Sequence, residues 1–309
     1  MSKPRKYIVA TRPSLLAFTQ TQQTVEMLRA KNPDVEFEIL KITTHGDTVT
    51  DKPLTAFGGT GVFVKELENA IMDGRADFAI HSLKDVPTIQ PEELILAAFP
   101  LREDPRDVLL LRNGLRINDL NYTCTIGTGS PRRIVQIAEM IPTAHFTDLR
   151  GNIDTRIRKL EEGQYDGIVL AAAGLTRMGK QIEADSCLPV EACVPAVGQG
   201  VIAIECRKGD EETIALVRTI NDSNTETAIL AERGYMKTIG GGCKFPMGAY
   251  AVVEQDKLQM VVMLGNHHTQ QIIRFTGHGS VADPEGLGKE LAERIIKEAD
   301  NQGIEIIRN

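Results

Sequence analysis

Residues 65–83, KELENAIMDGRADFAIHSL, and residues 156–174, RIRKLEEGQYDGIVLAAAG, share one order of features. In each stretch an amphipathic segment ends at a glycine, Gly74 or Gly163, and an aspartate three residues later precedes a short apolar run. Such a segment predicts a helix that ends at the glycine, and such a run predicts a buried strand. The two stretches therefore predict a helix–strand unit that occurs twice in the chain.

A second repeated pattern lies where an apolar run meets a helix start. Residues 9–14 read VATRPS, and residues 126–132 read IGTGSPR. In both, small residues and a proline follow the run, which predicts a strand, a turn and the start of a helix. Two similarly built α/β domains with a ligand cleft between them would explain both repeats. Chance similarity between strand–helix units would explain them as well.

Short apolar runs alternate with amphipathic segments through the first two-thirds of the chain, a pattern typical of largely parallel sheets. The expected strands are residues 7–10, 37–43, 77–81, 95–99, 107–111, 123–126, 145–149, 167–172 and 201–206. Helices are expected to start near Ser14, Val62, Pro131, Ile153 and Thr213.

The pattern changes after about residue 221. A helix is expected over residues 225–237, followed by three glycines at 240–242. Extended segments are then expected near residues 247–253, 258–264 and 271–277, and a charged helix over 284–301. Strands grouped before a helix predict a small α+β domain.

The size and charge of the chain narrow the classes of function. Its 309 residues suit two or three domains, and 42% hydrophobic with 25% charged residues is the balance of a soluble globular protein. The formal net charge of -7 argues against nucleic acid or an anionic membrane as a partner. An anionic ligand would therefore need a local cluster of basic residues.

The sequence gives no sign of export, of a membrane anchor or of a metal site. No apolar run approaches the ~18 residues of a membrane span, and the first residues lack the apolar core of a signal peptide. The five cysteines are odd in number and form no CxxC pair, which argues against a disulfide scaffold or a zinc site. A cytoplasmic protein with free thiols is expected.

Residues 127–133, GTGSPRR, carry the strongest indication of a binding site. Ser130 is placed to cap a helix that begins at Pro131, and a helix start attracts anions. Arg132 and Arg133 in the first turn oppose the helix dipole, so their placement makes sense if an anion offsets the repulsion. The alternative is a solvated helix start whose arginines face water.

Other arginines follow the ends of further expected strands. In open α/β sheets ligands bind at the carboxyl ends of strands, and arginine suits the planar recognition of carboxylates. Together these residues predict a basic pocket in an acidic protein. They are Arg12 with Ser14, Arg150, Arg156 and Arg177.

Lys84 and Asp85 follow the expected strand at 77–81. They could form a surface ion pair of little energetic value. A carboxylate at the end of a strand could instead stabilise a cation or move a proton at a reacting centre. His81 is expected to be a packed strand residue.

Cys243 follows the glycines at 240–242 and precedes Lys244. The glycines would let the thiol protrude, and the lysine would favour the thiolate. A lone cysteine is usually inert, so this feature alone leaves both readings open. The other four cysteines are expected to be packing residues.

Taken in chain order, these stretches resemble the porphobilinogen deaminase family. The resemblance covers nearly the whole chain and thins only near its end. The matching pieces are residues 10–12 with Ser14, 58–59, 63–68, 81–87, 102–107, 127–128 with Ser130, 132–133, 149–152, 170–171, 173–175, 195–200 and 241–243.

The resemblance implies an α/β fold of three domains. The first two resemble the lobes of type II periplasmic binding proteins, and the third is a small α+β domain with an antiparallel sheet. The implied boundaries are residues 1–100 with 200–219 for domain 1, 101–199 for domain 2, and 220–309 for domain 3, which carries the cysteine loop.

The resemblance also implies a reaction, the head-to-tail condensation of four porphobilinogens into hydroxymethylbilane with release of ammonia. A dipyrromethane cofactor, held through a thioether to Cys243, primes the chain. Asp85 is the implied catalytic carboxylate, which stabilises the cation left when ammonia departs. A cytoplasmic monomer with a small-molecule substrate and no nucleic-acid, membrane or metal partner is expected.

The resemblance assigns two further groups of residues. Those expected to bind the cofactor, besides Cys243, are Lys84, Asp85, Thr128, Ser130, Arg132 and Arg133. Those expected to bind the substrate and growing chain are Arg12, Ser14, Phe63, Arg150, Arg156, Arg177 and Gln199.

The sequence departs from the common family pattern at Thr60, Gly129, Pro131 and Gly240, which bears on substrate affinity and loop behaviour more than on the type of reaction.

Two other functions remain open. A two-lobed binding protein for an anionic metabolite would have the same lobes, and a cysteine hydrolase would use the thiol, although no histidine partner for it is indicated.

Overall fold

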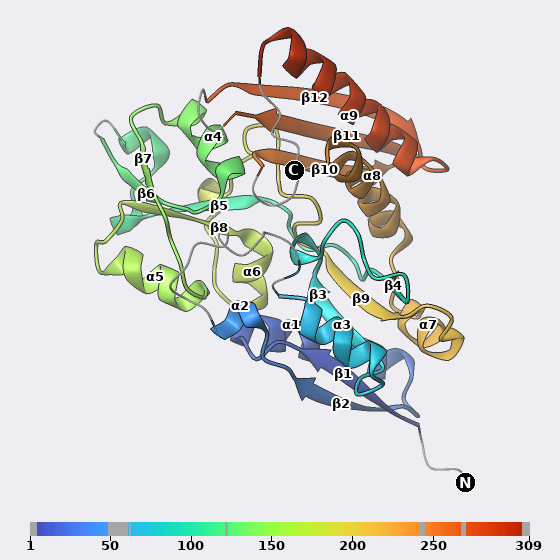
Figure 1. Ribbon diagram of the computed structural model, residues 1–309. Coiled ribbons are helices and arrows are strands. Elements are labelled where there is room, and N and C mark those ends of the chain that lie inside the picture. The colour runs from blue at the N-terminus through green and yellow to red at the C-terminus, as the bar shows by residue number, and fades with distance from the viewer. Residues whose placement is uncertain are drawn as a thin grey trace. The chain divides into compact units, whose positions relative to one another are not determined.

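The computed structural model describes residues 5–48, 61, 63–120, 123–240, 245–266 and 270–304 (Figure 1). Residue contacts divide the chain into two units. Unit 1 comprises residues 1–103 and 201–226, and unit 2 comprises residues 104–200 and 227–309. Among the described residues, no helix combines the length and the apolar character that crossing a membrane requires.

Unit 1 contains a five-stranded sheet in the order β2-β1-β3-β9-β4. β1 (Lys6–Thr11) pairs in parallel with β2 (Glu36–Lys41) and with β3 (Phe78–Ser82). β9 (Ile202–Arg207) runs antiparallel to both β3 and β4 (Leu94–Ala98). The parallel strands therefore end at one edge of the sheet, and β9 begins at that edge.

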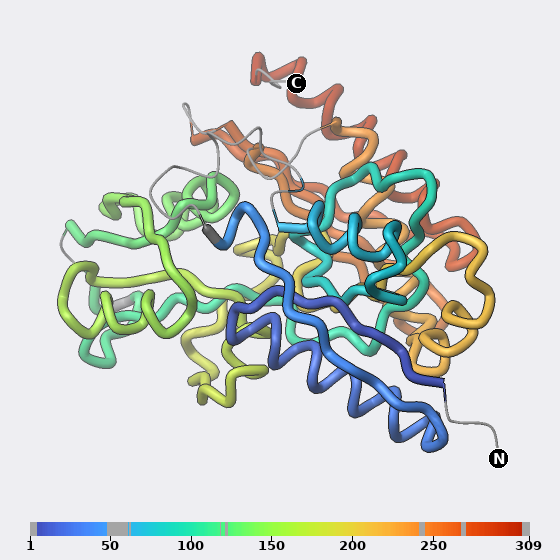
Figure 2. The backbone as a smooth tube through the Cα atoms, turned by 60° about the horizontal axis from the view of Figure 1, so that its bottom comes forward, coloured from blue at the N-terminus to red at the C-terminus, as the bar shows by residue number. Residues whose placement is uncertain are grey.

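Helices cover both faces of this sheet, as the alternation of side chains along a strand requires. α1 (Leu15–Lys31) and α7 (Glu211–Arg218) pack on the face that carries Val9. α3 (Lys65–Met72) packs on the face that carries Ala10. Figure 2 shows α1 alongside β1 and β2, all in blue.

Unit 2 contains a four-stranded sheet in the order β5-β8-β6-β7. β6 (Thr125–Gly127) pairs in parallel with β7 (His145–Thr147) and β8 (Gly167–Ala171), whereas β5 (Asp107–Leu111) runs antiparallel to β8. α4 (Pro131–Met140) contributes to the core on one face, and α5 (Ile153–Glu161) with α6 (Ala172–Arg177) to the core on the other.

The two repeated stretches of the sequence have the same local structure. In each, the helix ends before a glycine of positive φ, 73° at Gly74 and 78° at Gly163, a conformation that favours glycine. The following aspartates then accept a hydrogen bond from the neighbouring strand. Asp77 Oδ2 accepts from Ile8 N at 2.7 Å, and Asp166 Oδ2 accepts from Thr125 N at 2.8 Å. The repeat is therefore structural rather than accidental.

Unit 2 also contains an antiparallel sheet of β10 (Met247–Glu254), β11 (Lys257–Gly265) and β12 (Ile272–Ser280). α9 (Pro284–Asn301) and α8 (Ser223–Ile239) share its apolar core, in which Tyr235 is fully buried. The predicted α/β class is confirmed: two sheets of mainly parallel strands covered by helices, and a smaller antiparallel sheet with its own helices.

Local differences from the sequence-based expectations are small. The strand expected over 167–172 ends at Ala171, because α6 begins at Ala172. α2 (His45–Thr48) was not expected, and the helix expected near Val62 begins at Lys65. Both sheets of mainly parallel strands contain an antiparallel strand, which the apolar runs alone did not reveal.

Candidate functional site

A pocket in unit 1 lies where β1 and β3 end and α1 begins. Its polar lining includes residues that the sequence singled out, and apolar side chains complete the lining. The lining residues are Arg12, Ala17, Gln20, Phe63, Val64, Ile80, His81, Ser82 and Asp85. The structure therefore brings together Arg12, Phe63 and Asp85, which are far apart in the sequence.

Asp85 closes a short 3-10 turn, Leu83–Asp85, directly after β3. Leu83 is buried and anchors the turn, whereas Asp85 is exposed at the pocket and Lys84 is half-buried. Within the described part of the chain, the carboxylate of Asp85 makes no hydrogen bond or ion pair. An anionic group in this state is available to a cation in the pocket.

Arg12 is held by two neighbours rather than free. Its Nη2 and Nε donate to Asp47 at 2.6 and 3.3 Å, and its guanidinium lies 4.1 Å from the centre of the Phe63 ring. Burial alone would raise the pKa of Asp47, but hydrogen bonds from Arg12 and Thr44 outweigh it and keep that pKa below its usual value. These contacts fix the Arg12 guanidinium at the pocket wall.

Ser14, predicted to bind substrate, has a capping role in the fold. Its Oγ accepts from Ala17 N at 3.4 Å and caps α1, with Ser14 in an extended conformation as a helix cap requires.

One residue of the pocket lining, His81, belongs to a buried pair of ionisable residues. His81 Nε2 lies 3.0 Å from Glu205 Oε2, and both side chains are almost fully buried. Glu205 Oε1 has no hydrogen-bond partner among the described residues. Burial, and the charge of Glu205, raise the pKa of the neighbouring Glu68. His81 is a packed strand residue, as predicted, and its partner Glu205 was missed.

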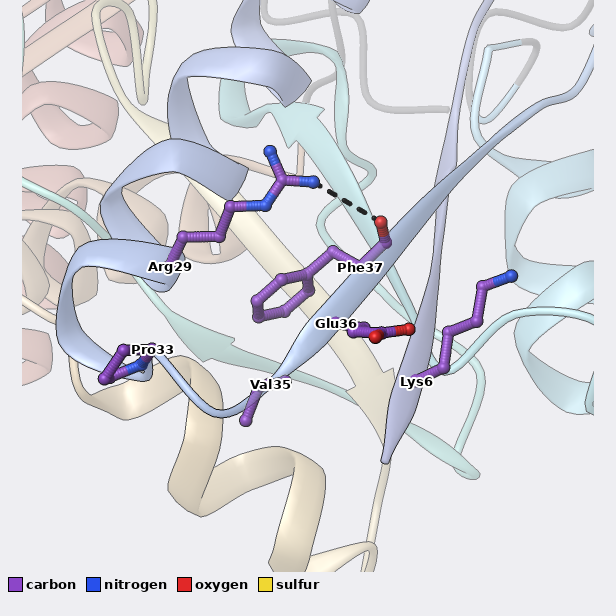
Figure 3. A pocket seen from close by; sticks show the side chains of 6 residues that line it. All are labelled: Lys6, Arg29, Pro33, Val35, Glu36 and Phe37. Atoms are coloured by element: carbon purple, nitrogen blue, oxygen red, sulfur yellow. Dashed lines mark hydrogen bonds between the residues drawn. The ribbon is translucent and has the colours of Figure 1, made fainter. Parts of the chain in front are cut away.

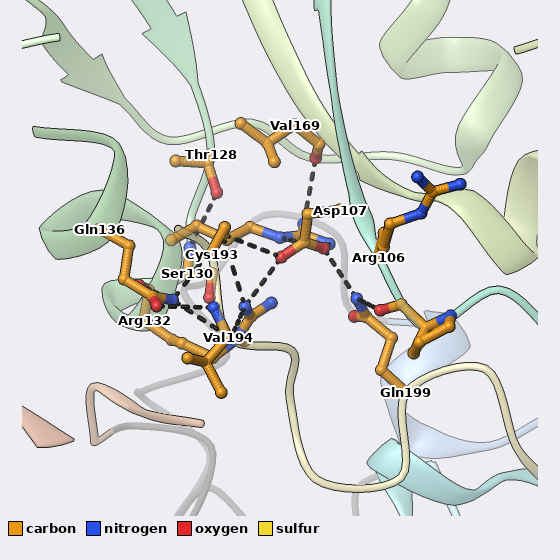
Figure 4. A network of polar contacts seen from close by, with 12 residues as sticks. Arg106, Asp107, Thr128, Ser130, Arg132, Gln136, Val169, Cys193, Val194 and Gln199 are labelled. Carbon is orange, nitrogen blue, oxygen red and sulfur yellow. Dashed lines mark hydrogen bonds and ion pairs between the residues drawn. The ribbon is translucent and has the colours of Figure 1, made fainter. Parts of the chain in front are cut away.

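Unit 2 holds a second cluster around Asp107, which is fully buried (Figure 4). Arg132 Nη1 lies 2.8 Å from Oδ2, and Arg133 donates to Oδ1 through Nη2 at 2.7 Å and Nε at 3.1 Å. Gln199 Nε2 donates to the same Oδ1 at 2.9 Å, and Cys193 Sγ donates to Oδ2 at 3.5 Å. The arginines are thus buried against an internal anion, not solvated.

The position of Asp107 follows from the direction of β5. Because β5 is antiparallel to β8, its first residue pairs with Ala171 at the end of β8, the edge where β6 and β7 also end. Burial alone would raise the pKa of Asp107, but the two guanidiniums outweigh it and hold that pKa far below its usual range. Burial and the Asp107 charge raise the pKa of Cys193 to about 12, so this thiol stays protonated and donates.

The start of α4 retains capacity for an anion. Pro131 is its first residue, and Ser130 precedes it without capping the helix through its side chain, contrary to expectation. Ser130 N instead donates to Thr128 Oγ1 at 3.2 Å. The side-chain contacts of Arg132 within the described residues all use Nη1, to Asp107, Val194 O and Cys193 Sγ. Its Nε and Nη2, with the N–H groups of the first turn, suit a carboxylate.

Three other arginines of unit 2 are half-buried and partly engaged. Arg150 Nε donates to Asp148 at 2.7 Å, and Arg156 Nε donates to Gly151 O at 2.7 Å. Arg177 Nη2 donates to Gly200 O at 2.7 Å. Each follows the end of a strand, β7 or β8, as predicted.

Cys243, predicted to anchor the cofactor, and Thr60 lie outside the described residues. Of the other cysteines, Cys124, Cys193 and Cys206 are buried and Cys187 is half-buried, all as free thiols. The packing role predicted for them fits this burial.

Another pocket lies at the opposite end of the unit 1 sheet, where β1 and β2 begin (Figure 3). It is lined by Lys6, Arg29, Pro33, Val35, Glu36 and Phe37. Arg29 Nη2 donates to Phe37 O at 3.4 Å, and Lys6 pairs with Glu38. Parallel strands place catalytic groups at their carboxyl ends, so this pocket is the weaker candidate.

Comparisons with known proteins match both units. Residues 7–215 match the family model described as porphobilinogen deaminase, dipyromethane cofactor binding domain, and residues 226–297 match porphobilinogen deaminase, C-terminal domain. The porphobilinogen deaminase of Brevibacillus brevis is 45% identical over 292 residues, 94% of each chain. That of Roseiflexus castenholzii is 43% identical over 93% of this chain and 95% of its own, and that of Bacillus subtilis 41% over 96% and 98%.

Proposed function

Because the chain belongs to the porphobilinogen deaminase family, it is a hydroxymethylbilane synthase, and we propose which of its residues perform the reaction. This transferase of tetrapyrrole biosynthesis condenses four porphobilinogens head to tail and releases ammonia. Membership of the family favours it over the alternative, a binding protein for an anionic metabolite. The observation that carries the residue assignment is the exposed carboxylate of Asp85 in the unit 1 pocket.

Asp85 is the proposed catalytic residue. Loss of ammonia from porphobilinogen leaves a positive charge on the pyrrole, and a nearby carboxylate without a competing cation stabilises that charge. When the new carbon–carbon bond has formed, the attacked ring carbon must lose its proton, and the same carboxylate can accept it. Lys84, the preceding residue of the chain, and Arg12, which lines the pocket, would hold carboxylate groups of the ligand.

The residues at the start of α4 fit the dipyrromethane cofactor of the family. Arg132 keeps two donor nitrogens without a partner in the described residues, and the uncapped helix start adds N–H donors. We assign Thr128, Ser130, Arg132 and Arg133 to its carboxylates, and Cys243 to its covalent attachment. Within the protein, the three guanidinium nitrogens of Arg133 already donate to Asp107 and Val169 O, so Arg132 is the better placed of the two arginines. When bound, the cofactor supplies the primer to which the first substrate unit is joined.

The remaining predicted residues are assigned to the acetate and propionate groups of the substrate and the growing chain. Arg150, Arg156 and Arg177 are half-buried cations at strand ends, suited to carboxylates. Phe63 offers a ring face beside Arg12. Ser14 and Gln199 are assigned to the substrate as well, and within the protein they also cap α1 and bind Asp107, respectively.

The organisation of the chain completes the proposal. We assign residues 1–100 with 200–219, 101–199 and 220–309 to three domains. We further propose a cytoplasmic monomer that acts on porphobilinogen without a nucleic acid, membrane or metal partner. The net charge of -7 supports the exclusion of polyanionic partners.

The test is turnover by the purified chain. With porphobilinogen as the only substrate, we expect four ammonia molecules to be released for each hydroxymethylbilane formed. Tight binding of porphobilinogen with no release of ammonia would contradict the transferase and support the binding protein.

A further inference from the structure

The segment from Val194 to Gln199 is bound to the Asp107 cluster on one side (Figure 4). Val194 O accepts from Arg132 Nη1 at 2.6 Å and from Gln136 Nε2 at 3.2 Å, and Val194 N donates to Gln136 Oε1 at 2.7 Å. At the other end of the segment, Gln199 Nε2 donates to Asp107. The arginine of the proposed cofactor site is therefore fixed partly by this segment.

The same segment is bound to the antiparallel sheet and its helix on the other side. Ala249 N on β10 donates to Pro195 O at 3.0 Å. Glu232 on α8 is fully buried and accepts from Gly198 N at 2.7 Å through Oε2 and from Ala251 N at 2.9 Å through Oε1. Hydrogen bonds to a buried carboxylate are among the stronger ones in proteins.

The contact between segment and sheet is also close. A Cβ on Gly248 would lie 2.8 Å from the carbonyl oxygens of both Val194 and Pro195. β10 thus approaches the segment as nearly as a glycine allows, and a shift of one would move the other.

Glu232 lies on α8, the helix that precedes Cys243, so its contacts with the segment bear on cofactor attachment. α8 ends at Ile239, four residues before Cys243. If one small molecule is bonded to Cys243 and held by Arg132 through its carboxylates, the helix end and the arginine must keep a fixed separation. A misplacement of about 1 Å can cost two orders of magnitude in rate.

We propose that residues 194–199 form a strap that keeps the carboxylate-binding arginines aligned with the end of α8, and that Glu232 is a positioning residue for cofactor attachment. This inference rests on the proposed function. It assigns a role in loading to residues that do not themselves contact the cofactor.

The test compares cofactor loading among variants of the full chain by intact mass spectrometry of the folded fraction. Glu232→Gln keeps the size of the side chain but replaces one acceptor oxygen with an amide NH2, which cannot accept a hydrogen bond from a backbone N–H. Gln136→Met removes both side-chain bonds to Val194, together with those to the Arg132 carbonyl and Cys193 Sγ, and leaves every arginine side chain and Cys243 unchanged. We expect the loaded share of folded protein to fall at least threefold in each.

A matched control uses another contact between α4 and the same sheet. Glu139→Gln breaks the 2.7 Å ion pair to Arg274 on β12, which lies outside the strap, and we expect loading as in wild type. A purely structural role would lower the folded yield and leave the loaded share of folded protein unchanged.

Four results would overturn the strap. In the first two, both strap variants carry as much cofactor as wild type, or the Glu139→Gln control loses as much cofactor as they do. In the third, a strap variant gives less folded protein but the loaded share of that protein is unchanged. In the fourth, neither strap variant folds. A wild-type protein that never carries added mass would instead contradict the proposed function.

Discussion

Asp85 and Asp107 are both aspartates at strand ends, yet their surroundings are opposite. Asp107 is fully buried and receives donors from Arg132, Arg133 and Gln199. Asp85 is exposed at a pocket and has no hydrogen-bond or ion-pair partner in the described chain. Asp107, whose carboxylate is bound by donors within the protein, stabilises the fold. Asp85, whose carboxylate has no such partner, is available to stabilise a transient cation.

The largest expected effect is on stability. Asp107→Asn leaves two buried guanidiniums without their anion, and loss of one partner of a buried ion pair typically costs ~3–5 kcal/mol. We expect the free energy of unfolding, measured in urea at pH 7, to fall by about that amount.

The pH dependence of the unfolding free energy shows whether the loss of charge causes this destabilisation. Because the arginines lower the pKa of Asp107, its stabilising contribution is complete above the unfolded value of about 4 and is lost as pH falls toward the folded value. The stability gap between wild type and Asp107→Asn should therefore narrow below about pH 4. A gap that is independent of pH would point to packing rather than charge.

The next effect is on turnover. Asp85→Asn removes the charge that stabilises the cation, and loss of one such partner typically costs ~3–4 kcal/mol, about 10²–10³-fold in kcat. Because Asp85 is exposed, the melting temperature should stay within a degree or two of wild type, about the shift of a surface change. Near-normal release of ammonia by this variant would remove Asp85 from the mechanism.

The smallest effect concerns the buried acids Glu68 and Glu205. Burial and Glu205 raise the pKa of Glu68, so the folded state is destabilised as pH rises from about 4.3, the unfolded value, through the raised folded value. Glu68→Gln is neutral at every pH. The unfolding free energy of Glu68→Gln minus that of wild type should therefore increase from pH 4 to pH 7. If this difference stays constant or decreases, the pKa of Glu68 is not raised in the folded state.

Features set by local sequence were predicted well. The repeated glycine and aspartate positions became equivalent helix ends and strand contacts, with Asp77 and Asp166 in the same role. β5 and α9 have the predicted bounds, and Arg12 and Asp85 line one pocket, as strand ends on one sheet edge require.

Features set by distant pairs were not predicted. The Arg133–Asp107 pair spans 26 positions and the His81–Glu205 pair spans 124, and no periodicity reports such partners. The sequence marks Asp107 only as a charged residue at the start of an apolar run. Its place beside the ends of β6 and β7 follows only from the antiparallel direction of β5, which the sequence did not reveal. Glu232 gave none, because its contacts are to backbone N–H groups.

The claim that unit 2 holds an anchored cofactor while Asp85 serves the chemistry is tested most directly by intact mass. Wild type, Cys243→Ser and Asp85→Asn would be purified in parallel and weighed. We predict the added mass of two pyrrole units on wild type and Asp85→Asn and none on Cys243→Ser. A folded wild type without added mass, or Cys243→Ser protein that retains it, would contradict the account.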